Sequence, residues 1–262
     1  NLEEAMALHK ETERFFRQTD NLNGLQVSLG NQAIILNQWD NPEEAMLLLK
    51  ETEQICRKLG VLEGLSRSLG NQAKIFFKWK KYEESMILHK EAERIFRQLG
   101  NLSGLSISFD NQARILEIWN QFEEAMALYK EQERICRQLG YLDGLSRSLG
   151  SQANILYKWG NLKESMALHK AAERIFRHLG NQDDLLTSLA NQALILKHWN
   201  KIEDAFALYK EEERICRELN DLNRLQNSLN NQGNILFGWG KFEEALNMHK
   251  EQERVCRQLR VL

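Results

Sequence analysis

The chain has 262 residues, 42% of them hydrophobic, with 35 Lys and Arg against 37 Asp and Glu and a formal net charge of −2. This balance excludes a disordered chain, and with a negative net charge a general affinity for nucleic acid is not expected. The longest apolar run, Ala45 to Leu49, ends at Lys50 and is too short to span a bilayer. No signal peptide is visible, so we expect a cytoplasmic protein. Because the chain starts without Met and in mid-pattern, we also expect a piece of a longer protein.

The predicted elements are helices from the first residues onward. The pattern predicts one helix over residues 1–19 and a second over 22–39, whose apolar side chains recur at steps of three or four. These side chains are Leu22, Leu25, Leu29, Ala33 and Leu36. A third helix is expected over 42–59, with Pro42 in its first turn and Gly60 as its stop. With one proline in the whole chain, little interrupts long helices.

The rest of the chain repeats these elements with a period of forty residues. The letters SLGNQA at 28–33 return at 68–73, and edited versions follow at 108, 148, 188 and 228. Such self-similarity predicts a solenoid of stacked helix pairs. We therefore expect one array over 1–262, with about thirteen helices and the last at 242–260. Its parts are a lone helix at 1–20 and helix-pair repeats at 21–60, 61–100, 101–140, 141–180, 181–220 and 221–262.

Several recurrent residues are expected to serve the fold alone. The four cysteines share one repeat position with Phe16, Phe96 and Phe176, which predicts reduced thiols in the core; they are Cys56, Cys136, Cys216 and Cys256. Ser28 and Gln32 recur in every copy on the buried side and are expected to pack. Lys50, Glu53 and Arg57 are expected on a solvated charged face, with Glu53 and Arg57 spaced for an i,i+4 pair.

Catalytic chemistry is not indicated by the sequence. His9, His89, His169 and His249 lie two copies apart in the repeat, a spacing too wide for a metal site. No nucleophile with a nearby His and carboxylate forms a unique constellation, and no Gly-rich phosphate loop occurs. We therefore expect no enzyme activity, no metal and no cofactor.

The stretch NQAIILNQWDNPEEAM resembles the tetratricopeptide repeat, whose paired helices each carry a small residue, here Ala33 and Ala45. The resemblance covers the whole chain, copy by copy. The period departs from the family's usual thirty-four residues, and repeats like those of kinesin light chains are more similar. The resemblance implies an all-α, right-handed superhelical solenoid of antiparallel helix pairs, in which the first helix of each pair lines a concave groove.

One stripe of these first helices lies outside the Leu, Ile and Trp pattern. It comprises positions 27, 31, 34 and 38 of each copy, and its 24 residues include six Lys or Arg and no Asp or Glu. An acid-free face in a chain of negative net charge would attract anions. Asn recurs at position 31 in five of six copies, and its amide both donates and accepts hydrogen bonds. The alternative is that these amides hold the helices together.

We predict from this stripe a site for a peptide. Its candidate residues are Asn31, Arg67, Asn71, Lys74, Lys78, Asn111, Arg114, Arg147, Ser151, Asn154, Lys158, Asn191 and Asn231, with Phe77 and Tyr157 beside them. Arg67, Asn71, Asn111 and Arg147 also match the register of related repeats that clamp a peptide's C-terminal carboxylate. Ser151 departs from that register, because the family has Arg there.

These observations predict a protein–protein interaction scaffold that binds an acidic, extended or helical segment along its Asn-lined groove between residues 67 and 158. The alternative is a structural array that self-associates end to end through apolar terminal faces. Nucleic-acid binding through the basic stripe is a third reading, which the net charge disfavours. No membrane partner is expected.

Overall fold

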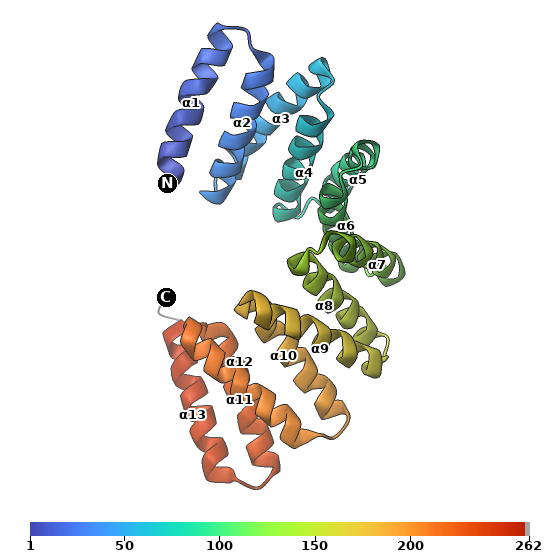
Figure 1. The fold of residues 1–262 in the computed structure, drawn as a ribbon. Helices are drawn as coiled ribbons and strands as arrows, with labels where there is room; N and C mark the ends of the chain where they lie inside the picture. The colour runs from blue at the N-terminus through green and yellow to red at the C-terminus, as the bar shows by residue number, and fades with distance from the viewer. Residues whose placement is uncertain (260–262) are drawn as a thin grey trace. The chain divides into compact units, whose positions relative to one another are not determined.

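The computed structural model describes residues 1–259, and over these it consists of helices joined by short turns (Figure 1). They form two compact units, Asn1–Leu139 and Gly140–Leu262, divided at a boundary between repeats. Unit 1 contains α1 Leu2–Gln18, α2 Leu22–Gln38, α3 Pro42–Leu59, α4 Leu62–Lys78, α5 Tyr82–Leu99, α6 Leu102–Ile118 and α7 Phe122–Leu139. Unit 2 contains α8 Leu142–Lys158, α9 Leu162–Leu179, α10 Gln182–His198, α11 Ile202–Leu219, α12 Leu222–Gly238 and α13 Phe242–Leu259.

The thirteen helices of the described residues confirm the expected all-α fold of stacked helix pairs. Even-numbered helices are the first-type helices of the repeat, and odd-numbered helices are the second type. Within each unit, consecutive helices pack on one another, and α2 also contacts α4. The last repeat was expected to reach residue 262, and its final three residues lie outside the described part. The superhelical course and the single array over 1–262 stay predictions.

Turn chemistry sets the helix ends where the sequence predicts them. Asn41 caps α3 by accepting a hydrogen bond from the backbone N–H of Glu44. Gly60 ends α3 in the left-handed conformation, at φ 70°, which side chains other than glycine rarely adopt. The chain therefore reverses direction within about three residues, and each helix packs antiparallel to the one before it.

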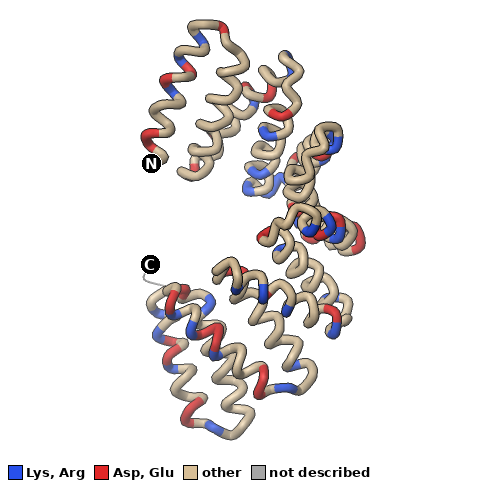
Figure 2. The backbone as a smooth tube through the Cα atoms, in the orientation of Figure 1, with Lys and Arg blue, Asp and Glu red and all other residues tan. Residues whose placement is uncertain are grey.

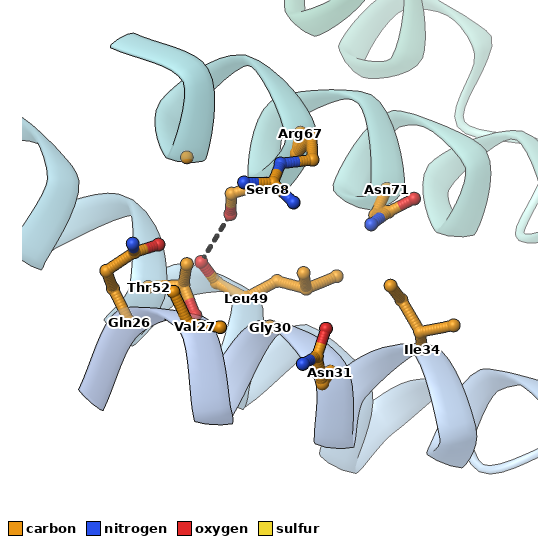
Figure 3. Close-up of a pocket in the computed structure, with 11 residues that line it drawn as sticks. Gln26, Val27, Gly30, Asn31, Ile34, Leu49, Thr52, Arg67, Ser68 and Asn71 are labelled. Atoms are coloured by element: carbon orange, nitrogen blue, oxygen red, sulfur yellow. Dashed lines mark hydrogen bonds between the residues drawn. The ribbon is translucent and has the colours of Figure 1, made fainter. Parts of the chain in front are cut away.

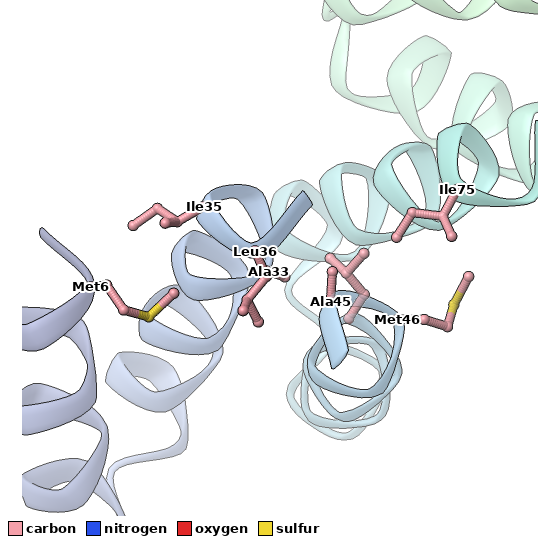
Figure 4. Packing of buried hydrophobic residues seen from close by; sticks show 8 residues of the cluster. Met6, Ala33, Ile35, Leu36, Ala45, Met46 and Ile75 are labelled. Carbon is pink, nitrogen blue, oxygen red and sulfur yellow. The ribbon is translucent and has the colours of Figure 1, made fainter. Parts of the chain in front are cut away.

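The core lies between the two helices of each pair and the helix that follows. One cluster in unit 1 joins α1, α2, α3 and α4 through Met6, Ala33, Ile35, Leu36, Ala45, Met46, Leu49 and Ile75 (Figure 4). Ala33 and Ala45, the small residues of the motif, are both buried where α2 meets α3. A larger side chain there would push the two helices apart, because protein interiors are packed as densely as organic crystals.

A polar network explains why SLGNQA recurs. The Ser68 hydroxyl donates to the backbone carbonyl of Leu49 at 2.7 Å, and the buried Gln72 amide donates to Glu53 at 2.7 Å. Glu53 also accepts a hydrogen bond from Arg57. The same guanidinium donates a second bond to Glu91, on the next second-type helix, at 2.7 Å. The same Gln-to-Glu bond recurs in four further copies, from Gln32, Gln112, Gln192 and Gln232. In these five copies, the bond joins the first-type helix to the second-type helix that precedes it.

This network corrects the expectation of a merely solvated charged face at Glu53 and Arg57. Their i,i+4 pair is present, and it also accepts a buried amide and bridges two helices. In the equivalent Glu13–Arg17 pair on α1, burial alone would raise the pKa of Glu13. Hydrogen bonds from Gln32 and Arg17 outweigh that effect and lower the pKa.

The cysteines follow the expectation of reduced thiols. All four are free; Cys56, Cys136 and Cys216 are buried, and Cys256 is half-buried. Burial raises the pKa of Cys56, and it raises that of Cys216 to about 12. Because the thiolate is the reactive form, the raised pKa values make Cys56 and Cys216 poor nucleophiles.

Candidate functional site

The sequence-predicted stripe lies on the first-type helices, which carry a distinctive charge pattern in unit 1. Along α2 no residue is charged, whereas α4 carries three cations and one acid (Figure 2). Arg67, Lys74 and Lys78 on α4 are exposed, as is Arg114 on α6. The Asn side chains of the stripe are half-buried: Asn31, Asn71 and Asn111 in unit 1, Asn191 and Asn231 in unit 2.

A pocket of about 40 Å³ lies between α2 and α4, with α3 beneath it (Figure 3). Its walls include Val27, Asn31 and Ile34 from α2 and Arg67 and Asn71 from α4, and these side chains face one another across the pocket. The structure thus brings together five stripe residues that the sequence places forty residues apart. Its volume is close to that of one water molecule, so the pocket accepts the tip of a ligand rather than a whole side chain.

The floor of this pocket was missed by the sequence analysis. Leu49 and Thr52 of α3 line it together with Gly30 of α2. The sequence does contain an indication that position 52 is free to vary and could therefore serve a site. The same repeat position holds Ala92, Gln132 and Glu212 in other copies, so the fold does not require one residue type there.

The asparagine amides of unit 1 are not used by the fold. Among the described residues, the side chains of Asn31, Asn71 and Asn111 make no hydrogen bond, although each is half-buried. A half-buried amide without a protein partner is open to solvent or to a ligand. The alternative that these amides hold the helices together therefore does not apply in unit 1.

In unit 2 that alternative does apply to one pair. The Asn191 amide donates to the side-chain carbonyl of Asn154 at 2.8 Å, which joins α10 to α8. The Tyr157 hydroxyl lies 2.9 Å from His198, and their rings meet edge to face. These contacts are internal, so the predicted site residues Asn154, Tyr157 and Asn191 have structural partners.

The cations of the stripe also differ in whether they form hydrogen bonds, ion pairs or ring contacts with the protein. Over the described residues, Arg67 and Lys74 form no hydrogen bond or ion pair. Lys78 donates to Asn37 at 3.2 Å. The Arg114 guanidinium lies 5.0 Å from the centre of the Phe77 ring, in cation–π contact. The stripe of unit 1 therefore presents two unengaged cations, Arg67 and Lys74, and a third, Arg114, that pairs only with a ring.

Lys74 has an unusual environment for an exposed residue. Desolvation by the surrounding protein lowers its pKa from the ordinary value. Its neighbour His89, buried on α5, has a pKa lowered to about 4, chiefly by burial and further by Lys74. The site accordingly has a single positive charge at this point, because His89 is neutral at physiological pH.

In unit 2, the arginine of the stripe forms an ion pair within its own helix. The Arg147 guanidinium donates to Asp143, four residues earlier, at 2.6 Å. Ser151 and Asn154 are half-buried, and Lys158 is exposed. The carboxylate clamp suggested by the sequence uses Arg67, Asn71 and Asn111 of unit 1 with Arg147 of unit 2, and it stays a prediction.

Residues 1–259 contain neither a cluster of side chains suited to a metal ion nor a helix suited to a membrane. No three His, Cys, Asp or Glu side chains of this part lie close enough together to hold a metal ion. Within the same range, no helix combines the length and apolar character needed to cross a membrane.

Comparison with known proteins supports the fold. No family model and no curated protein matches the chain. Among solved structures, the tetratricopeptide-repeat sensor protein of the STAND ATPase class from Pyrococcus horikoshii superposes with a TM-score of 0.83 at 16% identity, over 99% of this chain and 40% of that one. This chain thus corresponds to less than half of that protein.

Two further structures share the architecture. The kinesin light chain-like repeats of Podosopora anserina match with a TM-score of 0.59 at 16% identity, covering 74% of this chain and 95% of that one. A Rap protein complexed with Competence and Sporulation Factor matches with a TM-score of 0.61 at 15% identity, covering 92% and 80%. The chain therefore has a tetratricopeptide-repeat-like fold, as the sequence resemblance implies.

Proposed function

We propose that this protein is an interaction scaffold and that the unit 1 stripe binds an acidic, extended peptide segment. The observation that carries the proposal is the set of unengaged groups on one face: Asn31, Asn71 and Asn111 without hydrogen bonds, and Arg67 and Lys74 without ion pairs. Amides can bind the backbone of a ligand whatever its sequence, whereas guanidinium and ammonium groups select carboxylates. The Rap structure, complexed with Competence and Sporulation Factor, gives this proposal a precedent on the same fold.

The test is charge reversal with a matched control. R67E/K74E/R114E reverses the three stripe cations, and K50E/K90E/K130E changes the net charge equally on second-type helices, where all three lysines are exposed. The probe is a fluorescein-labelled nonapeptide with Glu at alternate positions, amidated at its C-terminus. We expect the stripe variant to lose binding in fluorescence anisotropy and the control to keep it, with equal helical circular dichroism. Equal affinity of both variants would remove the proposal.

A second arm addresses the carboxylate clamp. The same peptide with a free C-terminal carboxylate should bind more tightly than its amide only if the clamp register at Arg67, Asn71, Asn111 and Arg147 is used. Because Arg147 already pairs with Asp143, we expect the free carboxylate to add little. A large gain that disappears in R147E would support the clamp.

A second candidate function is self-association, for which exposed apolar side chains give a specific observation. Phe237, Phe242 and Leu246 are exposed on α12 and α13. The rings of Phe237 and Phe242 pack on each other at 5.3 Å. Sedimentation across a range of concentrations tests it: a species that grows with concentration and is monomeric in F242S/L246N supports it, and a strict monomer counts against it.

A further inference from the structure

Two positions of the second-type helices lie beneath the first-type helices, and in unit 1 they line the pocket as Leu49 and Thr52. On α11 in unit 2 the same repeat positions hold Tyr209 and Glu212, which we call the α11 pair. This helix packs against both α10 and α12. The Ser228 hydroxyl of α12 donates to the backbone carbonyl of Tyr209 at 2.7 Å, the bond that the equivalent serine of α4 makes to Leu49. The α11 pair therefore occupies, in unit 2, the place of the pocket floor in unit 1.

Both members of the α11 pair are buried polar groups without a partner. Tyr209 is 1% and Glu212 is 5% exposed, and among the described residues the Tyr209 hydroxyl and Oε2 of Glu212 have no hydrogen-bond partner. The two lie near each other, because Glu212 adds to the effect of burial in raising the pKa of Tyr209 to about 12. Ala92 and Ala172 stand at the repeat position of Glu212, so the fold does not require a polar side chain there. Unpaired buried polar groups that the fold does not need indicate a ligand.

The equivalent pair on α7 in unit 1 shows how the protein satisfies such groups by itself. The Tyr129 hydroxyl donates to Glu117 at 2.6 Å, and the Gln132 amide donates to Asp110 at 3.3 Å. Both acceptors lie on α6. The residues of α10 at these acceptor positions are Ala190 and the exposed Lys197. Neither side chain accepts a hydrogen bond, so the α11 pair lacks the partners that the α7 pair has.

The charges around the α11 pair favour a cation. Asp221, which caps α12, raises the pKa of Glu212, whereas Arg224 lowers it, and both effects are smaller than that of burial. Arg224 itself binds Asp183 of α10 at 2.7 Å and lies 3.3 Å from Asp221. In contrast to α4, the stripe positions of α10 and α12 hold no Lys or Arg. An ionised carboxylate in these surroundings attracts a positively charged hydrogen-bond donor.

We propose that the α11 pair of Tyr209 and Glu212 binds a primary ammonium group, such as the end of a lysine side chain. The ammonium donates to the buried carboxylate oxygen of Glu212 and to the hydroxyl oxygen of Tyr209. An ammonium is compact, whereas a guanidinium presents a wide planar fork. The equivalent pocket of unit 1 has a volume of only about 40 Å³, which suits the smaller group. This site lies within unit 2 and goes beyond the acidic-peptide function proposed for unit 1.

The experiment compares peptides that differ in one side chain. Four amidated nonapeptides of Ser and Gly, labelled with fluorescein at the N-terminus, carry lysine, norleucine, trimethyllysine or arginine at the centre. Anisotropy titrations at pH 8 keep Glu212 ionised, since its pKa is about 7. We expect the lysine peptide to bind about tenfold more tightly than norleucine, which has no charge, and trimethyllysine, which has no N–H donor. Equal affinity for lysine and norleucine overturns the proposal, and tighter binding of arginine overturns the choice of an ammonium.

Variants of the protein connect this preference to the α11 pair. E212Q should lose the preference for lysine over norleucine while keeping its helical circular dichroism, because the carboxylate it replaces has no bond at Oε2 to lose. Y209F removes only the hydroxyl and should weaken the preference. The control E203Q removes an exposed acid from the same helix, with the same change in net charge, and should keep the preference in full. An undiminished preference in E212Q would show that lysine binds elsewhere and that the proposal is wrong.

A last arm distinguishes the two sources of such a group, a protein segment and a free amine. n-Butylamine reproduces the end of the lysine side chain without a peptide backbone. If butylamine competes with the lysine peptide at comparable affinity, the ligand is a small amine; if the peptide binds far more tightly, the ligand is a protein segment. Either result supports the site when E212Q abolishes it. If neither probe responds to E212Q, the two buried groups serve the fold alone and the proposal fails. R67E/K74E/R114E should keep the lysine preference, so this outcome is independent of the unit 1 function.

Discussion

Within the recurrent NQA triplet, adjacent residues differ in burial and in hydrogen bonding. Asn71 is half-buried and makes no hydrogen bond, whereas Gln72 is buried and donates to Glu53 at 2.7 Å. A helix turns about 100° per residue, so consecutive positions face different neighbours. One triplet can therefore supply a binding group and a structural bond without either compromising the other.

Substitution of each residue distinguishes the structural bond of Gln72 from the unbonded amide of Asn71. Q72A should lower the free energy of unfolding by about 1–3 kcal/mol, because Glu53 loses a buried donor. N71A should change it by less than about 0.5 kcal/mol, because no bond is lost. Urea unfolding followed by circular dichroism measures both. An N71A variant destabilised as much as Q72A would show that the amide has a structural bond after all.

Glu212 on α11 is a residue that the sequence analysis did not single out. It is 5% exposed, its Oε2 is buried without a hydrogen-bond partner, and burial raises its pKa to about 7. Arg224 lowers that pKa and Asp221 raises it, and both effects are smaller than that of burial. The folded state therefore binds a proton more tightly than the unfolded state does.

The second prediction follows from the sign of that shift. The stabilising effect of the protonated Glu212 is fully present below about pH 4.5 and is lost as the pH rises through about 7. E212Q should therefore be more stable than wild type at pH 8, by an amount on the order of 2–3 kcal/mol, with a much smaller difference at pH 5. Thermal melts at both pH values test this. The exposed control E203Q should show no gain at pH 8.

At His169, burial makes stability depend on pH in the opposite direction, because it lowers the pKa of a basic group. Burial lowers its pKa to about 4, and neither ring nitrogen has a hydrogen-bond partner among the described residues. Its unfolded state takes up a proton first, so stability falls as the pH drops from about 6.5 towards 4. H169L, with the residue that stands at position 49, should remove part of this acid sensitivity and cost no hydrogen bond. Melting temperatures at pH 5 and pH 7 check it, and an unchanged difference between them would contradict it.

At the scale of elements, ion pairs connect consecutive second-type helices across the repeat. Arg57 on α3 bonds Glu91 on α5, and Arg17, Arg177 and Arg217 make the equivalent pairs with Glu51, Glu211 and Glu251. Arg57 and Glu91 are 46% and 34% exposed, so solvent screens their attraction. These pairs fix the register of the helices more than they add to stability.

A double-mutant cycle measures the size of this contribution. From R57A, E91A and the double variant we expect a coupling free energy of about 0.5 kcal/mol, falling in high salt. Chemical unfolding gives all four free energies. A coupling above about 2 kcal/mol would mean that the pair is effectively buried.

The helices were predictable from sequence because every feature is repeated. Periodicity, Pro42 and Gly60 placed α2 and α3 within one residue of their observed ends. The engagement of individual cations was not predictable. Arg67 and Arg147 stand in nearly identical surroundings, LEGLSRSLG and LDGLSRSLG, yet only Arg147 pairs with the acid four residues earlier. Tyr141, which replaces Val61, donates to Asp143 and helps to hold it for Arg147.

The pocket between α2 and α4 marks another limit of the sequence. Its wall residues were predicted from the stripe, but its floor at Thr52 depends on how α3 lies beneath both helices. Glu212 illustrates the same limit, because its pKa depends on burial that periodicity alone does not reveal. Periodic patterns identify which face a residue occupies, and tertiary packing decides what it meets there.

At the scale of the whole molecule, the net charge of −2 gives no long-range attraction for an acidic ligand. Attraction must come from the local cations of the stripe, over distances comparable to the screening length. We expect the affinity for the acidic nonapeptide to fall several-fold as salt rises from about 0.05 M to about 0.5 M. Anisotropy titrations at several salt concentrations measure this, and an affinity independent of salt would contradict an electrostatic mode of recognition.

The recurrent Ser and Gln positions and the variable stripe position at 27, 67 and 107 belong to the same forty-residue period. Duplication, deletion or exchange of one period would change which chemical group stands at one place in the stripe and would keep the Ser and Gln positions that recur in every copy. The binding surface of such a chain can therefore change by one whole period at a time.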